Sequence, residues 1–197
     1  HQALADGYVY VQDREGLLGV EITPDLKLIG LFMGGNMSFE LTRFSIEPTI
    51  AEMTARALDV VGQNPEGFFL MVEGASIDKT SHSQSTAEMI GDLLAFDQAV
   101  GLALDYAKAH PGTLVVVTAD HETGGFGVTS GVPSGEVVNY GWLSTGHTAA
   151  MVPIYAFGPG AEQFTGTLDI TEIGVRIAQL MGITDFPAVL EKGQNEE

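Results

Sequence analysis

The chain has 197 residues, 45% of them hydrophobic, which is enough for one α/β domain with a sizeable core. Its 26 acidic and 8 basic side chains give a formal net charge of -18, which argues against nucleic acid or an anionic membrane surface as a partner, since both need a positive face. The absence of Cys excludes disulfides, thiolate metal sites and a Cys nucleophile, and no apolar run approaches the roughly 20 residues of a membrane span.

The amino-terminal segment predicts short strands. Two β-like pieces, Tyr8–Val11 and Leu17–Ile22, flank a polar turn at Asp13–Gly16, so a β-hairpin is expected there. Leu28–Met33 is a short apolar run of the kind that forms a buried strand.

A helix is predicted directly after Pro48. Thr49 followed three positions later by Glu52 is a capping-box pattern, and Gly62 marks the end of the helix. Apolar residues recur at helical spacing and form its expected buried stripe, namely Ile50, Met53, Ala57 and Val61.

The following residues alternate apolar runs with helical patterns. Strands are expected at Phe68–Val72, Leu114–Val117 and Met151–Phe157, and helices at about Ser85–Ala109 and Thr171–Met181. The long helix has an expected buried stripe made of Ile90, Leu93, Leu94, Val100 and Leu104.

Three segments are expected to lack regular structure. A polar loop holds Asp78 and His82, residues 123–143 form an irregular loop rich in Gly and Ser, and the acidic tail after Phe186 frays. No domain boundary is visible, so residues 1–197 are interpreted as a single domain.

The alternation of strands and helices predicts an α/β fold with a parallel sheet covered by helices on both faces. In open α/β sheets, ligands bind beyond the carboxyl ends of strands. Glu73 directly follows one predicted strand, and Asp120-His121 lies just past another. The sequence therefore places polar side chains where chemistry is expected.

Asp78 and His82 are four positions apart. On a helical turn both lie on one face, within reach of a single metal ion, and Glu73 could serve the same or a neighbouring ion. Taken alone, the pair is equally consistent with a surface loop that carries one solvated His.

Two further motifs add potential ligands. Asp120 and His121 can converge on one metal if they lie on a turn after the strand, and the alternative is a strand-end cap with an exposed His. His147 stands between Gly146 and Thr148, whose small side chains would let the backbone approach an ion. By itself a loop His of this kind is more often simply exposed.

Three ordered motifs closely resemble those of bacterial alkaline phosphatases. They are Gly67–Lys79, Val117–Gly125 and Gly146–Thr148, and their order and spacing also agree. The resemblance runs from about Leu28 to Met181. It implies a three-layer α/β/α sandwich with a mostly parallel sheet, represented here by its carboxyl-terminal part.

The resemblance also implies a function, the hydrolysis of phosphate monoesters with two Zn²⁺ and one Mg²⁺ per complete active site. Asp78, His82 and His147 match the protein ligands of the first zinc, which activates the water that attacks the phosphoenzyme. Asp120 and His121 match ligands of the second zinc, which stabilises the serine alkoxide.

Two other positions match the family pattern. Glu73 matches a ligand of the magnesium. Lys79 matches a position that in part of the family helps hold phosphate through water, with a solvated Lys as the alternative interpretation. Lys79 and His147 are therefore the candidates for contact with phosphate monoesters or inorganic phosphate.

Other parts of the family's active site have no counterpart in this sequence. The nucleophilic serine of the family lies in an Asp-Ser/Thr-Ala-type segment, and no serine here stands in that context. The phosphate-binding Arg, an Asp that joins the second zinc to the magnesium, and a Thr on the magnesium are also absent. No catalytic residue is assigned within the chain, and the amino-terminal half of the enzyme is the expected partner.

Two other functions compete with this interpretation. A phosphodiesterase, sulfatase or phosphomutase would use a similar metal site, although the Glu-Gly-Ala-Ser-Ile-Asp context argues against it. A non-catalytic metal-binding or interaction module would explain the lack of a nucleophile. A periplasmic or extracellular location and a homodimer follow from the family resemblance alone.

Overall fold

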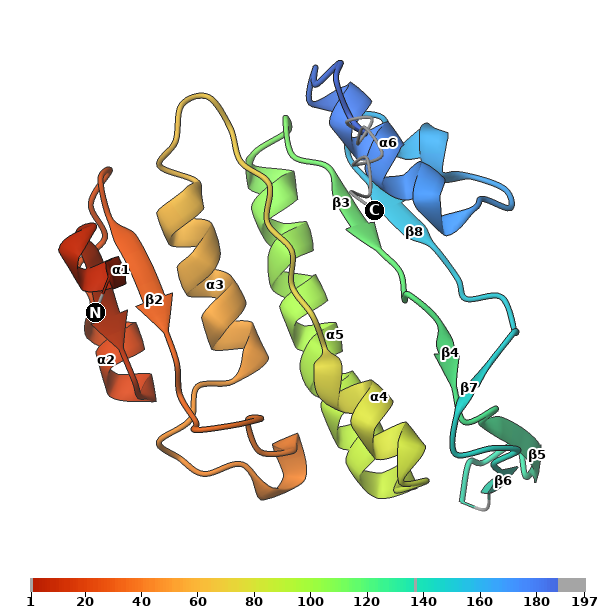
Figure 1. Ribbon diagram of the computed structural model, residues 1–197. Coiled ribbons are helices and arrows are strands. Elements are labelled where there is room, and N and C mark those ends of the chain that lie inside the picture. Colours follow the sequence, from red (N-terminus) through yellow and green to blue (C-terminus); the bar gives the residue numbers. More distant parts are fainter. Residues whose placement is uncertain (1, 137, 188–197) are drawn as a thin grey trace, which may run out of the picture.

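A computed structural model describes residues 2–136 and 138–187 of the chain and shows an α/β fold (Figure 1). The helices are α1 Gln2–Ala5, α2 Arg14–Gly19, α3 Ile50–Val61, α4 Ala75–His82, α5 Thr86–Ala109 and α6 Ile170–Leu180, with 3-10 turns at Glu40–Thr42 and Ala161–Phe164. The strands are β1 Tyr8–Val11, β2 Lys27–Gly30, β3 Val115–Val117, β4 Glu122–Thr123, β5 Gly127–Gly131, β6 Val138–Gly141, β7 His147–Thr148 and β8 Tyr155–Phe157. Within these ranges no helix combines the length and the apolarity that a membrane crossing requires.

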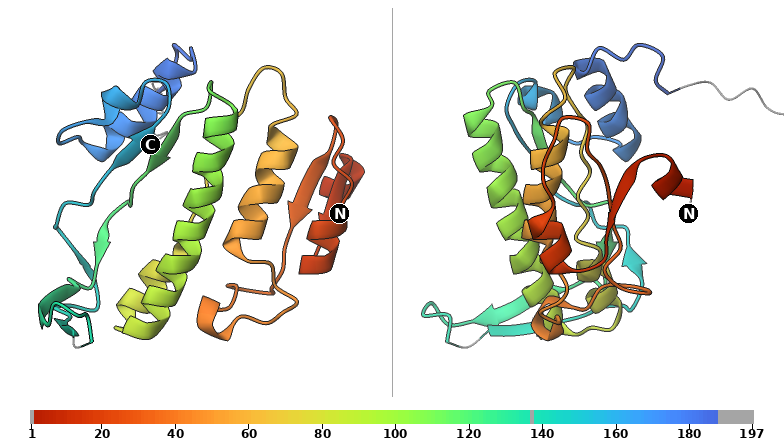
Figure 2. Two further views of the ribbon diagram at one scale, coloured as in Figure 1. Left: turned by 180° about the vertical axis from the view of Figure 1, so that it is seen from behind. Right: turned by 90° about the vertical axis from the view of Figure 1, so that its left-hand side faces the viewer.

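Short strands run through the middle of the molecule, with α3 and α5 on one side and α6 on the other (Figure 2). β1 pairs with β2 in parallel, whereas the pairs β3–β8, β4–β7 and β5–β6 are antiparallel. Among the described residues, the parallel pairing expected from the sequence is found in β1–β2 alone. β3 and β8 are antiparallel because the chain returns to β3 through an excursion of loops and short strands, without a crossover helix.

The predicted amino-terminal hairpin is wrong. Tyr8–Val11 is a strand, but the second predicted β piece overlaps α2. The side chain of Asp13 caps this helix by accepting a hydrogen bond from the Gly16 amide at 2.7 Å, and Leu17 is buried beneath it. The helix carries the chain back so that β2 pairs with β1 in parallel, which a tight turn cannot achieve.

The predicted start of α3 is confirmed. The Thr49 hydroxyl accepts a hydrogen bond from the Glu52 amide at 3.0 Å, and the Thr49 amide donates to the Glu52 carboxylate at 2.9 Å. Hydrogen bonds from Arg14 to the same carboxylate are the main cause of a lowered pKa of Glu52. The expected stripe is out of phase, because the buried positions of α3 are Thr54 and Leu58, each one position from a predicted residue.

The long helix is also confirmed, but its buried face differs from the prediction. Met89, Ala95, Ala99 and Ala107 are buried, whereas Ile90, Leu93 and Leu94 are 44%, 47% and 58% exposed. α5 packs against α3 and α4, and three of its four buried residues are Ala, whereas larger apolar side chains remain exposed. Periodicity could not select the buried face, because the helix is apolar on several sides.

Phe68–Val72 was expected to be a buried strand, and it forms no strand pair with any described residue. Phe68 lies 6.0 Å from the ring of Tyr106 on α5, so one face of the segment is packed. On the other face Phe69 and Met71 are 63% and 67% exposed. This segment therefore has the apolar composition of a central strand, but no described strand pairs with it and one of its faces is exposed.

The structure also changes the extent of several predicted segments. Residues 123–143 were expected to be irregular, and they contain the antiparallel pair β5–β6, which projects from the body of the molecule (Figure 2). β2 and β8 are shorter than the predicted runs Leu28–Met33 and Met151–Phe157. The final helix and its end at Gly182 are confirmed, and the predicted fraying of the tail concerns residues that mostly lie outside the described ranges.

Gly158 provides a test of the packing between β3 and the turn after β8. Its φ is +108°, and a Cβ atom there would fall inside contact distance of the Thr113 carbonyl oxygen. Gly158→Ala is therefore expected to lower the free energy of unfolding by about 1–3 kcal/mol, measured by urea denaturation.

Gly101→Ala is the matched control for this substitution. Gly101 lies inside α5 with open space where the Cβ would be, so the change is expected to raise stability by up to about 1 kcal/mol. Equal effects at both positions would contradict the packing described here.

Candidate metal centre

Helix α4 carries Asp78, Lys79 and His82, at a position where the sequence predicted a loop. The helix begins after Gly74, where a Cβ atom would lie about 3.0 Å from the side chains of Ile77 and Phe96. The helical turn places Asp78 and His82 on one face, as their spacing of four residues requires. Both side chains are partly exposed, at 38% and 39%, so an ion can reach them.

Three ligand atoms meet beside α4. The distance from Asp78 Oδ1 to His82 Nε2 is 3.3 Å, from His147 Nε2 to His82 Nε2 it is 3.2 Å, and from His147 Nε2 to Asp78 Oδ1 it is 3.5 Å. A tetrahedral zinc with bonds of about 2.0–2.1 Å separates its ligands by about 3.3–3.4 Å. The three atoms are therefore spaced like one face of a zinc tetrahedron.

The His82 ring is oriented by the loop that precedes β7. Its Nδ1 lies 2.6 Å from the carbonyl oxygen of Thr145, which can only accept a hydrogen bond. Nδ1 therefore carries the proton, and the lone pair of Nε2 points toward Asp78 and His147. A carbonyl partner of this kind is the usual means of setting the tautomer of a metal-binding His.

His147 reaches the site because β7 pairs with β4. Thr123 lies opposite His147 in this pair, and the Gly124 amide donates to the Gly146 carbonyl oxygen at 2.9 Å. Gly124 has a φ of +86°, and a Cβ there would collide with the ring of Trp142. This turn therefore depends on glycine, and the chain that returns from the β5–β6 hairpin is held against it by the Leu143 and Ser144 amides, which donate to the Gly124 carbonyl oxygen.

The β4–β7 pair is reinforced by a partly buried carboxylate. Glu122 accepts hydrogen bonds from the Gly125 amide at 2.8 and 3.1 Å and from the Thr148 hydroxyl. These bonds hold the turn after β4 and the residue that follows His147. The carboxylate is consequently a support for the site and is engaged away from the ligand atoms.

Asp120 and His121 lie next to each other after β3. His121 Nε2 is 3.2 Å from Asp120 Oδ2, a separation that also suits two ligands of one zinc. The His121 ring stacks on the His147 ring with centroids 3.5 Å apart, so the second pair adjoins the first three residues. Ligand atoms of Asp78, His121 and His147 all lie within 4.8 Å of one another.

Thr123 connects the two groups of ligands. Its hydroxyl donates to Asp78 Oδ1 at 2.6 Å and lies 3.2 Å from His121 Nδ1. Because a hydroxyl has one proton to donate, it must accept from the Nδ1–H of His121. This leaves Nε2 of His121 unprotonated on the side of Asp120, ready to bind a metal.

The other two candidate residues lie apart from these contacts. Glu73 is exposed and makes no hydrogen bond or ion pair with any described residue. Lys79 donates to the Asn36 side-chain oxygen at 3.0 Å. The structure thus brings together five of the predicted residues and leaves these two outside the cluster.

Sequence reasoning missed the supporting residues Glu122, Thr123 and Thr145. Each is adjacent or nearly adjacent to a predicted ligand, which is the one signal that could have indicated them. Their roles depend on pairing between segments about 25 residues apart, and local sequence does not reveal such pairing.

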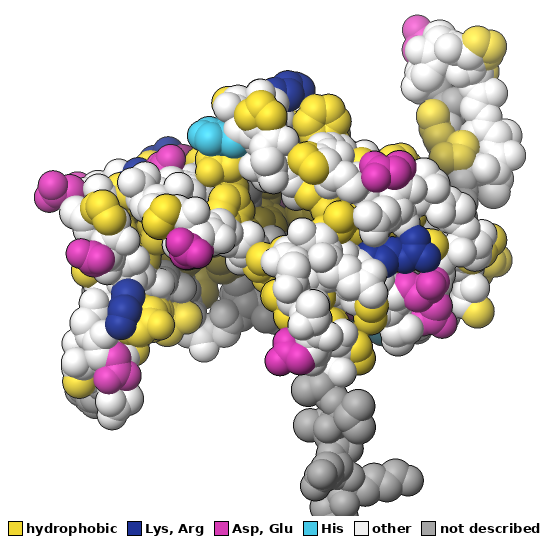
Figure 3. Space-filling view, turned by 90° about the horizontal axis from the view of Figure 1, so that it is seen from above, with side chains coloured by type: hydrophobic (Ala, Val, Ile, Leu, Met, Phe, Trp, Pro, Cys, Tyr) yellow, Lys and Arg dark blue, Asp and Glu magenta, His cyan; other side chains and the backbone are white. Residues whose placement is uncertain are grey.

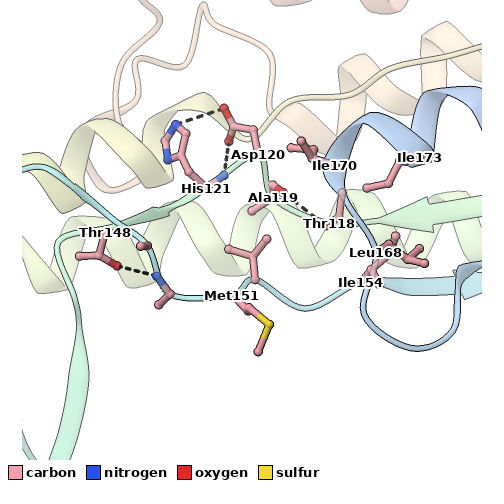
Figure 4. A pocket seen from close by; sticks show the side chains of 13 residues that line it. Thr118, Ala119, Asp120, His121, Thr148, Met151, Ile154, Leu168, Ile170 and Ile173 are labelled. Carbon is pink, nitrogen blue, oxygen red and sulfur yellow. Dashed lines mark hydrogen bonds and ion pairs between the residues drawn. The ribbon is translucent and has the colours of Figure 1, made fainter.

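Asp120 and His121 also line a pocket of about 240 Å³ (Figure 4). Its wall is largely apolar and includes Met151, Ile154 and Ile170. Figure 4 shows the Asp120 carboxylate and the His121 ring together at one end of the pocket, with apolar side chains at the other. The metal-ligand cluster therefore borders apolar surface that the described residues leave open.

Comparisons with known proteins agree on one family. A family model described as Alkaline phosphatase matches residues 1–138. Alkaline phosphatase H of Pseudomonas aeruginosa is 35% identical over 225 residues, covering 93% of this chain and 47% of its own length. The chain spans about half the length of the curated relatives it matches.

Solved structures support the same relationship. The cold-active alkaline phosphatase of Shewanella sp. matches with a TM-score of 0.81 and 25% identity, over 91% of this chain and 61% of that one. A variant of the TAB5 alkaline phosphatase, described with Mg bound, matches with a TM-score of 0.74 and 27% identity, over 92% of this chain and 55% of that one.

The role of Thr123 can be tested by metal affinity. Thr123→Val keeps the shape but removes the hydroxyl that orients Asp78 and His121, so zinc affinity is expected to fall by about 10–100-fold. Thr123→Ser is expected to retain zinc affinity close to the starting protein. Competition with a chromogenic chelator measures both variants.

Thr129→Val is the matched control, because Thr129 lies exposed on β5. It is expected to leave zinc affinity unchanged. An unaltered affinity in Thr123→Val would show that the hydroxyl does not support the ligands.

Proposed function

The chain belongs to the alkaline phosphatase family, and we propose that it supplies the metal-binding part of an enzyme that hydrolyses phosphate monoesters. The observation that carries the proposal is the triangle formed by Asp78 Oδ1, His82 Nε2 and His147 Nε2, with sides of 3.2–3.5 Å. Its spacing fits a single tetrahedral zinc and leaves a fourth position open for water or substrate.

A second zinc and a magnesium complete the proposal. Asp120 and His121 would hold the second zinc, which their 3.2 Å separation supports. Glu73 would contribute one carboxylate to magnesium, a hard cation that prefers oxygen ligands. A solved relative described with Mg bound is consistent with magnesium in this family.

The chain's own residues prepare the site for a dianion. The chain has a net charge of -18, so a phosphate monoester needs local positive charge. When bound, zinc supplies that charge and lowers the pKa of a coordinated water. His82 presents the unshared electron pair of Nε2 toward Asp78 and His147, and Lys79 on the same helix would add a cation.

We further propose that residues outside positions 1–197 supply the nucleophilic serine and the phosphate-binding arginine. The chain covers about half of its relatives, and no serine in it has the required sequence context. The unpaired segment Phe68–Val72 and the hydrophobic side chains open on the surface (Figure 3) support contact with a further part of the enzyme. A homodimer in the periplasm or outside the cell is proposed from the family alone.

Removal of single ligands tests the first zinc site. In the assembled enzyme, meaning this chain together with the half that carries the serine, His82→Ala and His147→Ala are each expected to lower bound zinc by about one ion per active site. Elemental analysis by mass spectrometry measures the zinc content.

His110→Ala is the control for these variants. His110 follows α5 and bonds to the Tyr106 carbonyl oxygen, away from the other histidines, so zinc content is expected to stay constant. Full zinc occupancy in both His82→Ala and His147→Ala would show that the first site is assigned to the wrong residues.

Substrate class is tested by assaying the assembled enzyme with p-nitrophenyl phosphate and bis(p-nitrophenyl) phosphate. Monoester hydrolysis is expected to exceed diester hydrolysis by several orders of magnitude. A preference for the diester would favour the phosphodiesterase interpretation. A chain that binds zinc but hydrolyses neither substrate with any partner would favour the non-catalytic one.

A further inference from the structure

Lys79 differs from most of the described cations. Five other described Arg and Lys side chains form ion pairs with carboxylates, namely Arg14 with Glu52, Arg43 with Glu40, Arg56 with Asp59, Lys108 with Asp105 and Arg176 with Glu172, whereas Lys27 donates to the Asp6 carbonyl oxygen. Lys79 forms no ion pair with a described carboxylate, although acids outnumber bases by 26 to 8. Its described partner is the neutral side-chain oxygen of Asn36, 3.0 Å from Nζ.

The segment that carries Asn36 is anchored by a buried carboxylate. Glu47 has 0% exposure, and its two oxygens accept hydrogen bonds from the Ser38 amide at 2.8 Å and the Ser38 hydroxyl at 2.7 Å. Pro48, which follows Glu47, is also fully buried. Burial of a carboxylate is costly unless its hydrogen bonds are satisfied, so this contact holds Ser38 firmly two positions after Asn36.

A second contact ties the same segment to α5. The Glu40 amide donates to Asp92 Oδ1 at 3.1 Å, and the side chain of Arg43 donates to the Glu47 carbonyl oxygen at 2.8 Å. The loop between β2 and α3 is therefore held at several points, and Asn36 is presented to α4 by a supported backbone.

We propose that Asn36 is a positioning residue for Lys79, the neighbour of Asp78 on α4, and that it holds the Lys79 ammonium with an amide oxygen that leaves its charge unneutralised. This inference rests on the proposed function, because it assumes that Lys79 acts on phosphate. Lys79 is next to Asp78 on α4, and its long side chain has many rotamers when nothing holds it. The amide removes that freedom.

The choice of an amide has an electrostatic consequence. A carboxylate at position 36 would keep the same hydrogen-bond geometry but would pair with the ammonium. At about 4 Å, opposite charges near a protein surface attract strongly enough to compete with a phosphate dianion for the same cation. Asn36→Asp is nearly isosteric, so it separates the charge of the partner from its shape.

The test uses the assembled enzyme and two probes, p-nitrophenyl phosphate as substrate and inorganic phosphate as competitive inhibitor. Asn36→Asp is expected to raise the inhibition constant for phosphate by roughly tenfold and Asn36→Ala by about threefold, with KM rising more than kcat falls. Zinc content is expected to remain that of the starting enzyme. Asn139→Asp on β6 is the control for added charge and is expected to change neither constant.

A double-mutant cycle distinguishes positioning from a general structural effect. In a Lys79→Ala background, Asn36→Asp and Asn36→Ala are expected to cause no further change, because the group they position is gone. Additive effects in that background would overturn the inference.

Lys79→Ala alone distinguishes a failure of the phosphate-binding role of Lys79 from a failure of the positioning role of Asn36. If it leaves phosphate inhibition unchanged, the role of Lys79 in the proposed function is wrong and the inference fails with it. If it weakens inhibition while both Asn36 variants match the starting enzyme, the inference alone is overturned.

Discussion

The candidate site depends on contacts that hold three polar side-chain atoms from separate parts of the chain close together. Asp78 and His82 come from one helix, and His147 comes from a strand 65 residues further along, yet their ligand atoms lie within 3.5 Å of one another. The β4–β7 pair and the turn at Gly124 make this approach possible. The Thr123 hydroxyl, which donates to Asp78, and the Thr145 carbonyl oxygen, which accepts from His82 Nδ1, then set which atoms face the centre.

The sequence was sufficient to predict elements whose stabilising contacts join residues close together in the chain. The capping box at Thr49 and the long helical pattern of α5 each involve neighbours within a few turns, and both were predicted correctly. The candidate ligands could be identified because each stands in a short polar motif beside an apolar run. Their mutual distances could not be predicted, since those depend on pairing between β4 and β7.

The sequence-based prediction of secondary structure and burial was wrong where a competing local contact or a distant part of the chain determines the structure. The cap at Asp13 turned an expected hairpin into a helix, and the all-round apolar surface of α5 hid its buried face. Phe68–Val72 has the composition of a central strand, but no described strand pairs with it. This segment lies directly before Glu73, and Glu73 is exposed, so the composition of the run did not predict the surroundings of that carboxylate.

Asp78, His82 and His147 are proposed to share one zinc ion. Crystals soaked with zinc and measured at the zinc absorption edge test it directly, because anomalous scattering locates the ion independently of any assumed function. We expect an anomalous peak at about 2.0–2.1 Å from Nε2 of both histidines and from an Asp78 oxygen. A fully occupied zinc elsewhere in the chain, with no peak among these three side chains, would contradict it.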